Sequence, residues 1–259
     1  SHNSKRGVYK MKISATIITL NEERNIDRCI RSLKGVADEI IVLDSFSTDN
    51  TEKICLEHGV VFEKREWEGY SESKNYLNSL ANCNYILSID ADEALDADLK
   101  QAILNLKKLN DPEIYSMNRL TNYCGKWIKH SGWYPDVKLR LFPKNGCSWE
   151  GEFVHEELVY PFNLSIQQLP GHLEHFSYYS FKGHRERADK YSTLTAMKMH
   201  KAGKKASILK PYLSGWTRFI SMYIVNGGIR DGKMGFKIAK ISAQSNIFKY
   251  KELRRLNQL

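Results

Sequence analysis

Residues 12–109 alternate between short apolar stretches and segments whose apolar residues recur at helical spacing, and this alternation constrains the fold more than any other feature. Short apolar stretches are typical of strands buried on both faces, and helical spacing is typical of helices that cover them. The predicted strands are residues 12–18, 39–44, 60–63 and 85–89, and the predicted helices are residues 22–34, 51–58, 71–81 and 96–109. Strict alternation predicts an α/β fold with a doubly wound, mostly parallel central sheet and flanking helices.

The chain after residue 111 follows other patterns. Three stretches are strand-like but irregular (115–124, 137–142 and 149–159), and three have helical periodicity (180–202, 207–227 and 233–255). We therefore expect an expression tag or disordered tail at residues 1–10, an α/β domain at residues 11–179 and a helical extension at residues 180–259.

The amino-acid composition argues against several classes of protein. The chain has 42% hydrophobic and 11% aromatic residues, which excludes a disordered chain. No stretch of 18 apolar residues occurs, so no transmembrane helix is expected. The five cysteines are scattered without a CxxC pair, which argues against a zinc site or a disulfide framework and favours a reducing cytoplasm.

Polar and acidic segments follow three of the predicted strands: TLNEE at 19–23, DSFSTDNT at 44–51 and DADE at 90–93. Ligands of open α/β sheets bind outside the carboxyl ends of the strands, so the three segments together predict one binding site. Asn21 is in addition predicted as the N-cap of the first helix. Asp90 and Asp92 can hold one hard divalent cation with a substrate's phosphates; the alternative is that they are ordinary turn and capping residues.

The order of these segments resembles glycosyltransferase family 2, whose fold is the GT-A nucleotide-sugar-binding fold, and the resemblance covers about residues 12–160. It implies catalysis within residues 11–179, a UDP-sugar donor and Mg²⁺ or Mn²⁺ as cofactor. The implied donor-binding residues share the strand-end edge, and they are Thr19, Asn21, Glu22, Asp44, Ser47, Asp49, Lys74 and Asp90. Within this set the resemblance implies that Asp44 binds the uracil or ribose. It also implies that Lys74 faces the nucleotide, at a position where relatives often carry Arg. Asp90 and Asp92 match the metal and diphosphate motif.

Residues 138–158 (KLRLFPKNGCSWEGEFVHEEL) resemble the subgroup that includes bacterial lipopolysaccharide-core β-glucosyltransferases, with Gly151, His155 and Glu156 matching a shared element. An inverting transfer needs a base that deprotonates the acceptor hydroxyl as it attacks the anomeric carbon. We favour Glu156 as this base. The other candidates are Glu150, Glu152 and Glu157.

Other residues of this region have two interpretations each. His155 could add a metal or phosphate contact, or the whole element could be surface strand. His172 and His175 flank Glu174 and could bind a metal or make structural polar contacts. Three aromatic residues could stack on an acceptor sugar or pack in a core, namely Trp127, Trp133 and Tyr134.

Residues 180–259 carry 18 Lys and Arg against 4 Asp and Glu, a net charge of +14. Basic and apolar residues interleave there, which fits an amphipathic surface on anionic lipid or, alternatively, a helical core with a solvated basic face. No recognised nucleic-acid-binding module occurs, so no nucleic-acid partner is expected.

The leading hypothesis is an inverting transfer of a sugar, a hexose by the resemblance, to a lipid-linked or lipopolysaccharide-core glycan at the inner face of the cytoplasmic membrane. Two rivals belong to other classes. A nucleotidyltransferase usually has a basic, glycine-rich loop after the first strand, whereas residues 21–23 here are Asn-Glu-Glu. The second rival is a non-catalytic membrane-surface protein that retains the fold.

Overall fold

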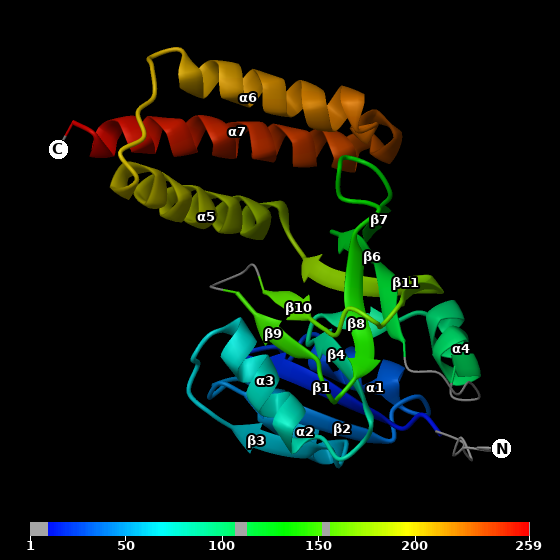
Figure 1. The fold of residues 1–259 in the computed structure, drawn as a ribbon. Coiled ribbons are helices and arrows are strands. Elements are labelled where there is room, and N and C mark those ends of the chain that lie inside the picture. The colour runs from blue at the N-terminus through cyan, green and yellow to red at the C-terminus, as the bar shows by residue number, and fades with distance from the viewer. Residues whose placement is uncertain (1–9, 107–112, 152–155, 259) are drawn as a thin grey trace. The chain divides into compact units, whose positions relative to one another are not determined.

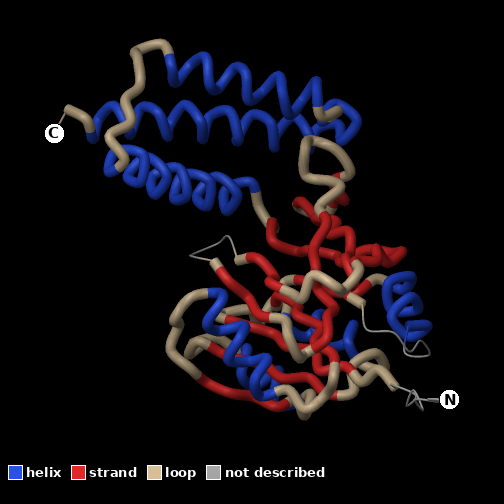
Figure 2. The backbone as a smooth tube through the Cα atoms, viewed as in Figure 1, coloured by secondary structure: helices blue, strands red, loops and turns tan. Residues whose placement is uncertain are grey.

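A computed structural model describes residues 10–106, 113–151 and 156–258 (Figure 1). The predicted tail, except for Lys10, lies outside the described residues. The chain forms two compact units, which we call the sheet unit (Ser1–Arg119 with Val137–His175) and the helical unit (Leu120–Asp136 with Phe176–Leu259). Figure 2 shows strands and helices interspersed in the first and mainly helices in the second. The division assigns residues 120–136, part of the α/β domain expected from the sequence, to the helical unit.

The predicted alternation of strands and helices is confirmed in the first part of the sheet unit. Its elements are β1 (Ile13–Thr19), α1 (Ile26–Leu33), β2 (Glu39–Asp44), α2 (Thr51–Glu57), β3 (Val61–Lys64), α3 (Tyr70–Leu80) and β4 (Tyr85–Asp90). The strands pair in the order β3-β2-β1-β4, and every pair is parallel. Consequently the carboxyl ends of β1, β2 and β4, with their polar segments, meet at one edge.

The first helix begins later than the sequence predicts. Asn25 is the N-cap residue of α1, so the prediction of Asn21 as the N-cap is wrong. Asn21 has a φ of 54°, a left-handed conformation that Asn adopts more readily than most residues. Its side-chain Oδ1 accepts a hydrogen bond from Thr48 N over 2.8 Å, so Asn21 connects two loops instead of capping a helix.

Later segments of the chain complete the sheet. Its further elements are β5 (Glu93–Leu95), α4 (Ala97–Leu106), β6 (Ile114–Tyr123), β8 (Val137–Pro143) and β11 (Ile166–Tyr178), in the order β4-β8-β6-β11-β5, with β7 (Lys126–Ile128) paired to β6. The pairs β4–β8, β8–β6, β6–β7 and β11–β5 are antiparallel, so the sheet is mixed. The stretch 149–159 is not one strand: β9 (Ser148–Glu150) and β10 (Glu157–Val159) form an antiparallel pair. β11 was not predicted, because its sequence IQQLPGHLEHFSY lacks a clear apolar alternation.

Both faces of the sheet carry a hydrophobic core. Helices α1 and α4 cover one face, where Ile17 of β1 packs in the same cluster as Ile30 and Ile103. On the other face Leu43 of β2 packs with Leu77 of α3 and with Phe142 of β8. The two layers fix the strand ends from both sides, and the site described below is built on those ends.

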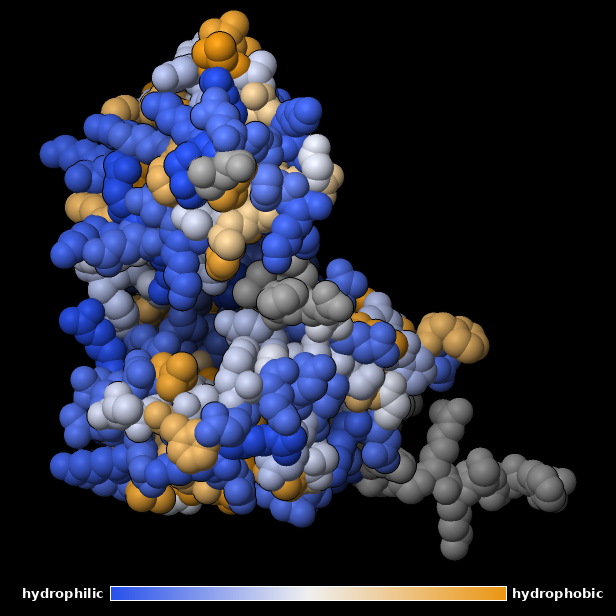
Figure 3. Space-filling model, turned by 90° about the vertical axis from the view of Figure 1, so that its left-hand side faces the viewer, coloured by the Kyte–Doolittle hydropathy of each residue, from blue (hydrophilic) through white to orange (hydrophobic). Residues whose placement is uncertain are grey.

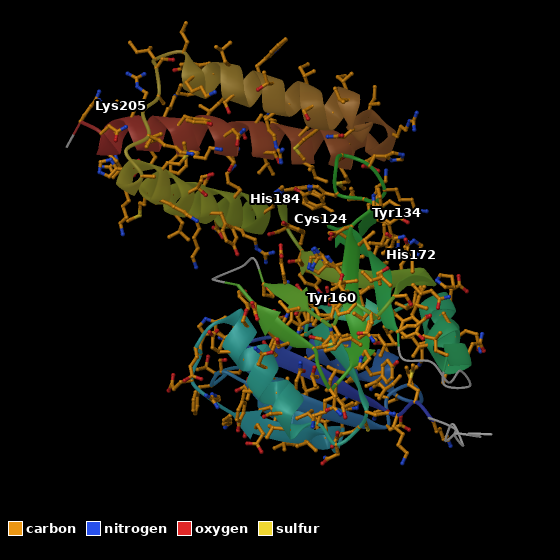
Figure 4. All side chains as sticks on the ribbon, viewed as in Figure 1. Cys124, Tyr134, Tyr160, His172, His184 and Lys205 are labelled. Carbon is orange, nitrogen blue, oxygen red and sulfur yellow. The ribbon has the colours of Figure 1, made fainter. Side chains whose placement is uncertain are left out.

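The helical unit contains α5 (Phe181–Lys201), α6 (Lys210–Ile220), a π-helical turn (Ser221–Val225), a 3₁₀ turn (Gly228–Asp231) and α7 (Gly232–Leu256). The three predicted helical stretches are therefore confirmed. Helix α7 packs against both α5 and α6 (Figure 1). His184 of α5 (Figure 4) lies 2.7 Å from the hydroxyl of Tyr123 inside an aromatic cluster. Among the described residues, no helix has both the length and the apolar character needed to span a bilayer.

Gly171 provides a test of how closely β11 approaches α4. It has a φ of +85°, and a Cβ atom there would lie 2.2 Å from the backbone nitrogen of Leu99. Gly35 has nearly the same φ, +83°, but its Cβ position has no described atom within 4 Å. Alanine at either position adds left-handed strain of about 1–2 kcal/mol. Only the new methyl group of Gly171→Ala would also clash with the backbone of Leu99. We therefore expect Gly171→Ala to lower the free energy of unfolding by about 1–3 kcal/mol more than Gly35→Ala.

Urea denaturation of the two variants measures this difference directly. Equal losses of stability would contradict the close approach of β11 to α4.

Candidate active site at the ends of the parallel strands

Hydrogen bonds join the loop after β1 to the loop after β2. Asn21 N donates to Ser47 Oγ over 2.7 Å, and Glu22 N donates to Thr51 Oγ1 over 2.9 Å. The structure therefore brings together Asn21, Glu22 and Ser47, which the sequence assigned to the nucleotide-binding loops. In this state their hydrogen bonds shape the edge of the sheet.

Two further residues complete this pair of loops. Asp49 Oδ2 accepts a hydrogen bond from Glu23 N over 3.1 Å, and Asp49 Oδ1 accepts one from Thr51 Oγ1 over 2.6 Å. The buried Oγ1 of Thr19 has no hydrogen-bond partner among the described residues. Asp49 is thus occupied in holding the loops, whereas the Thr19 hydroxyl retains its capacity for a ligand.

Asp44 ends β2 and is fully buried. Its Oδ2 accepts a hydrogen bond from Ser47 N over 2.8 Å, and its Oδ1 accepts one from Ser47 Oγ. The carboxylate therefore closes a tight turn on Ser47. The carboxylate retains capacity to accept further hydrogen bonds, but in this structure its burial closes it to a base or ribose.

Asp90, the last residue of β4, lies between two cationic side chains. Arg140 of β8 donates from Nη2 to Asp90 Oδ2 over 2.8 Å, and Lys74 Nζ of α3 lies 3.4 Å from Asp90 Oδ1. Both cations are buried, with only 3% of the Lys74 side chain exposed. Within the described residues Asp90 Oδ1 is a buried atom without a hydrogen-bond partner.

These charges control the protonation of Asp90. Burial alone would raise the pKa of its carboxyl group, but the charges of Arg140 and Lys74 outweigh burial and hold that pKa below its ordinary value. Burial opposes the charge on Arg140 as well, yet Asp90 and Glu93 raise the pKa of its guanidinium. Asp90 is therefore a permanent anion at the edge of the sheet.

Glu93 extends this network on the side away from Lys74. Its carboxylate is fully buried and accepts a hydrogen bond from Arg140 Nη2 over 2.8 Å, and Arg119 Nη1 lies 3.3 Å from the same oxygen. Glu93 Oε2 also accepts a hydrogen bond from Asp90 N over 3.0 Å. Arg140 is thus held in place by two carboxylates, and the backbone of the DADE turn is held by Glu93.

Glu156 lies on the other side of Lys74, whose Nζ donates to its Oε1 over 2.9 Å. The same ammonium lies 4.8 Å from the centre of the Trp149 ring. Glu150 and Glu157 are exposed on the β9–β10 pair, whereas the Glu156 side chain is 17% exposed. Lys74 therefore links Glu156 to Asp90. The other two residues named for this element, Glu152 and His155, lie outside the described residues.

Asp92 has a histidine neighbour. His175 Nε2 of β11 lies 3.3 Å from Asp92 Oδ2, and both side chains are partly buried. Burial raises the pKa of the Asp92 carboxyl group, but the hydrogen bond and charge of His175 outweigh this and lower it. His172, labelled in Figure 4, instead lies 3.2 Å from Asp96 Oδ2. The two histidines of the HxxH motif thus contact different carboxylates.

Asp92 and His175 are the residues here that could contribute ligands to a divalent cation. No group of three or more His, Cys, Asp or Glu suited to a metal ion occurs in the described part of the chain. Mg²⁺ in phosphate-transferring sites is commonly held by one or two carboxylates together with substrate phosphates, and Mn²⁺ accepts both carboxylate and imidazole. Asp92 and His175 could supply two ligands of such an incomplete protein donor set, whereas Asp90 Oδ1 lies 3.4 Å from the Lys74 ammonium.

The aromatic residues considered for sugar stacking lie in the helical unit. Trp133 packs on Tyr178 with ring centroids 5.1 Å apart, and its edge meets Tyr123 at 5.5 Å. Trp127 packs on Phe176 at 5.4 Å. For Trp133 this geometry favours the core interpretation.

Sequence reasoning gave no role to two residues of the site, Glu93 and Arg140, and named His175 as a possible metal ligand without its partner Asp92. Glu93 stands inside the DADE motif, and Arg140 lies in the segment KLRLFP, which was noted without a role for its arginine. His175 was considered only together with His172. The pairing of β11 with β5, which places His175 opposite Glu93, was the missing information.

The fold and the strand-end site agree with a comparison against protein families, in which residues 14–191 match the model of glycosyl transferase family 2. The chain belongs to this family. The resemblance inferred from the motifs is thereby confirmed, and so is the expected α/β fold of the GT-A type.

Two relatives of this family 2 glycosyltransferase match it along most of their length. An uncharacterized glycosyltransferase of Rickettsia typhi is 30% identical over 256 residues, which covers 95% of this chain and 88% of the relative. The lipopolysaccharide core biosynthesis glycosyltransferase LpsC of Rhizobium meliloti is 29% identical over 234 residues, covering 88% and 86%.

Among solved structures, glucosyl-3-phosphoglycerate synthase of Mycobacterium tuberculosis, in complex with Mn²⁺, UDP and glucosyl-3-phosphoglycerate, is 26% identical. It covers 44% of this chain and 45% of its own, with a TM-score of 0.36. This likeness is too limited to carry an argument about the site.

Replacing Arg140 tests the charge network of this family 2 enzyme. Arg140→Met leaves the carboxylates of Asp90 and Glu93 without their main partner, so we expect a loss of about 3–5 kcal/mol in the free energy of unfolding at neutral pH. The surface pair of Arg31 with Asp27 provides a control, because Arg31→Met should change stability by less than about 1 kcal/mol.

The loss should also depend on pH. In the native protein the lowered pKa of Asp90 contributes stability that is present above its ordinary pKa of 3.8 and lost below it. In Arg140→Met burial raises this pKa instead, so the variant's deficit should shrink as the pH falls from 7 toward 4. Denaturation at several pH values measures the deficit, and a constant value across this range would argue against the network.

Proposed function

We propose that this family 2 glycosyltransferase transfers a sugar, a hexose by preference, from a UDP-sugar to a glycan acceptor with inversion at the anomeric carbon and with a divalent metal ion. The observation that carries the proposal is the charge network at the end of β4. Asp90 is held there between Lys74 and Arg140, and Lys74 also binds Glu156. Two carboxylates and two cations thus form a connected network at the edge where α/β folds bind ligands.

The loops after β1 and β2 supply the nucleotide-binding part of the proposal. Thr19, with its unpartnered hydroxyl, and Asn21 are assigned to the nucleotide together with Glu22, Ser47 and Asp49. Asp44 is assigned to uracil or ribose. Lys74 is assigned to the diphosphate, because its buried ammonium would bind a phosphate oxygen as a point charge.

Asp90, Asp92 and His175 are the groups proposed to hold Mg²⁺ or Mn²⁺. When bound there, the cation would neutralise charge on the diphosphate leaving group. The task of the chain's own residues is orientation, since Arg140 and Glu93 fix the backbone and side chain of Asp90 before any ligand arrives. His155, also named for this role from the sequence, keeps its assignment only as a prediction.

Glu156 is proposed as the general base. Its Oε1 is fixed by Lys74, so its carboxylate is oriented and lies next to the residue assigned to the diphosphate. A base in that place would take the proton of the acceptor hydroxyl as the oxygen attacks the anomeric carbon. The Lys74 ammonium would then contact both the diphosphate of the donor and the base that activates the acceptor.

The acceptor is proposed to be a lipid-linked or lipopolysaccharide-core glycan. LpsC, a relative of nearly the same extent, is described as a lipopolysaccharide core biosynthesis enzyme, and this supports the assignment. Such an acceptor places the enzyme in the cytoplasm, at the inner face of the membrane, where the net charge of +14 in residues 180–259 favours contact with anionic lipid.

Family membership favours this reaction over the nucleotidyltransferase alternative. The acidic loop after β1 agrees, because it lacks the basic, glycine-rich sequence that holds a triphosphate. A non-catalytic protein that retains the fold would not need two buried cations around Asp90, since each costs desolvation energy.

Asp92→Asn tests the metal assignment. The substitution keeps the volume of the side chain but removes its charge, so we expect loss of sugar transfer with a melting temperature within a few degrees of the native protein. The measurement is UDP release with and without Mn²⁺. Native turnover at saturating donor and metal would remove Asp92 from the site.

Glu156→Gln tests the base. We expect acceptor-dependent transfer to fall by about 100-fold or more, because a positioned general base contributes on the order of 10²–10⁴. UDP affinity, measured by calorimetry, should change little. Glu157→Gln is the matched control, since Glu157 is the exposed neighbour, and it should retain the native rate. If Glu157→Gln were the slower variant, the base would be Glu157 instead.

A further inference from the structure

Helix α6 packs on α7 through small residues. Pro211 and Gly215 are its buried positions. A Cβ atom at Gly215 would lie 2.5 Å from Cγ1 of Ile247 and 3.1 Å from the backbone oxygen of Ala243, so glycine allows the two helices to approach closely. Phe219, near the end of α6, also packs toward α7, with its ring centre 5.7 Å from that of Phe236.

The opposite face of α6 carries large apolar side chains that are exposed. Leu209, Tyr212, Leu213 and Trp216 recur at spacings of three and four residues, which places them along one face of a helix. We call these four residues the α6 stripe; they are 65%, 55%, 58% and 67% exposed. Figure 3 shows hydrophobic side chains at the end of the helical unit that carries α6, surrounded by hydrophilic surface.

Neighbouring residues lengthen this apolar surface. Ile208 precedes the stripe, and Ile224 and Val225 of the π-helical turn follow it, with exposures of 67%, 55% and 75%. Isolated exposed apolar residues are common on soluble proteins, but several large ones along one face of a helix are typical of a surface that binds a partner or a membrane. In a surface helix, an apolar face of this kind normally packs against the core. In α6 the stripe faces solvent instead.

Basic residues lie on α6 itself and in the segment that precedes it. Residues 203–229 contain four Lys and Arg and no Asp or Glu. All four are exposed: Lys204, Lys205, Lys210 and Arg218. Lys251 of α7 adds a cation, with its Nζ 5.1 Å from the centre of the Tyr212 ring. An apolar face with aromatic residues and a basic border matches the chemistry of an anionic lipid interface, with the apolar row in the acyl boundary and the cations at the headgroups.

We infer that the α6 stripe inserts into the headgroup–acyl boundary of an anionic bilayer and that the surrounding cations bind its headgroups. A second copy of the chain is the less favourable occupant, because a two-fold contact through this surface would bring the cations beside the stripe in one copy against the same cations in the other. The inference deepens the proposed membrane location by naming the element that inserts. It does not depend on the glycosyl transfer itself.

Two contributions to binding are separable by salt. The electrostatic contribution should weaken as the Debye length falls from about 10 Å at 0.1 M salt to about 3 Å at 1 M. The apolar contribution should persist, since burial of a large side chain strengthens binding by about tenfold or more at any ionic strength. A charged surface without insertion would lose nearly all its binding at high salt.

The experiment is co-sedimentation of the full chain with vesicles of phosphatidylcholine, with or without phosphatidylglycerol, at low and high salt. We expect preferential binding to the anionic vesicles. The variant Leu213→Gln/Trp216→Gln should bind them at least about tenfold more weakly at both salt concentrations. Leu56→Gln is the matched control, because Leu56 of α2 is also 58% exposed but lies in the sheet unit, and it should bind like the native chain.

A second readout tests insertion without relying on affinity. Phosphatidylcholine with brominated acyl chains, mixed with phosphatidylglycerol, should quench tryptophan emission of the native chain, and Trp216→Phe should remove most of this quenching. UDP affinity should be the same in all variants. A failure of UDP binding in the native chain would count against the proposed function and leave the vesicle result intact.

Three outcomes would overturn the inference. One is equal binding of the native chain and the double variant to anionic vesicles, which would mean that charge alone acts. Another is the absence of any vesicle binding. The third is self-association in sedimentation velocity that the double variant abolishes, without vesicle binding, which would assign the stripe to a second copy of the chain.

Discussion

The ion pair of Asp90 with Arg140 is the interaction on which the arrangement of the site depends. It joins the last residue of β4, the outermost of the parallel strands, to the antiparallel strand β8 beside it, so the two halves of the mixed sheet are connected by charge as well as by backbone hydrogen bonds. Glu93 holds the other side of the guanidinium. Lys74 compensates the remaining oxygen of Asp90. A buried carboxylate is tolerated there only because cations reach it from two different elements.

This arrangement gives the proposed chemistry a preorganised starting point. The groups assigned to donor, metal and acceptor are fixed by one another rather than by solvent, and reorganisation at the moment of reaction is correspondingly small. Lys74 is central, because it contacts both Asp90 and Glu156. A diphosphate would compete with these two carboxylates for the same ammonium. Donor binding and the position of the base are in that way coupled through one side chain.

Much of this could be predicted from the sequence. The apolar strands of the parallel half and the acidic segments after them have local signals, so their convergence followed from the rule that parallel strands end on one edge. The antiparallel half has no comparable signal. β11 is polar and contains Pro170 and Gly171, so its pairing with β5, and therefore the place of His175, comes from tertiary contacts. Asn21 looked like a helix cap because its side chain suits either role, and its hydrogen bond to the next loop decided the outcome.

The dependence of Asp90 on Arg140 has a consequence for synthesis on the ribosome. The parallel strands lie within the first 90 residues and emerge first, but the guanidinium that compensates Asp90 emerges only about 50 residues later in the chain. Of the two buried cations that contact Asp90, only Lys74 has been synthesised before that point. The charge balance at the end of β4 is therefore complete only after β8 has emerged.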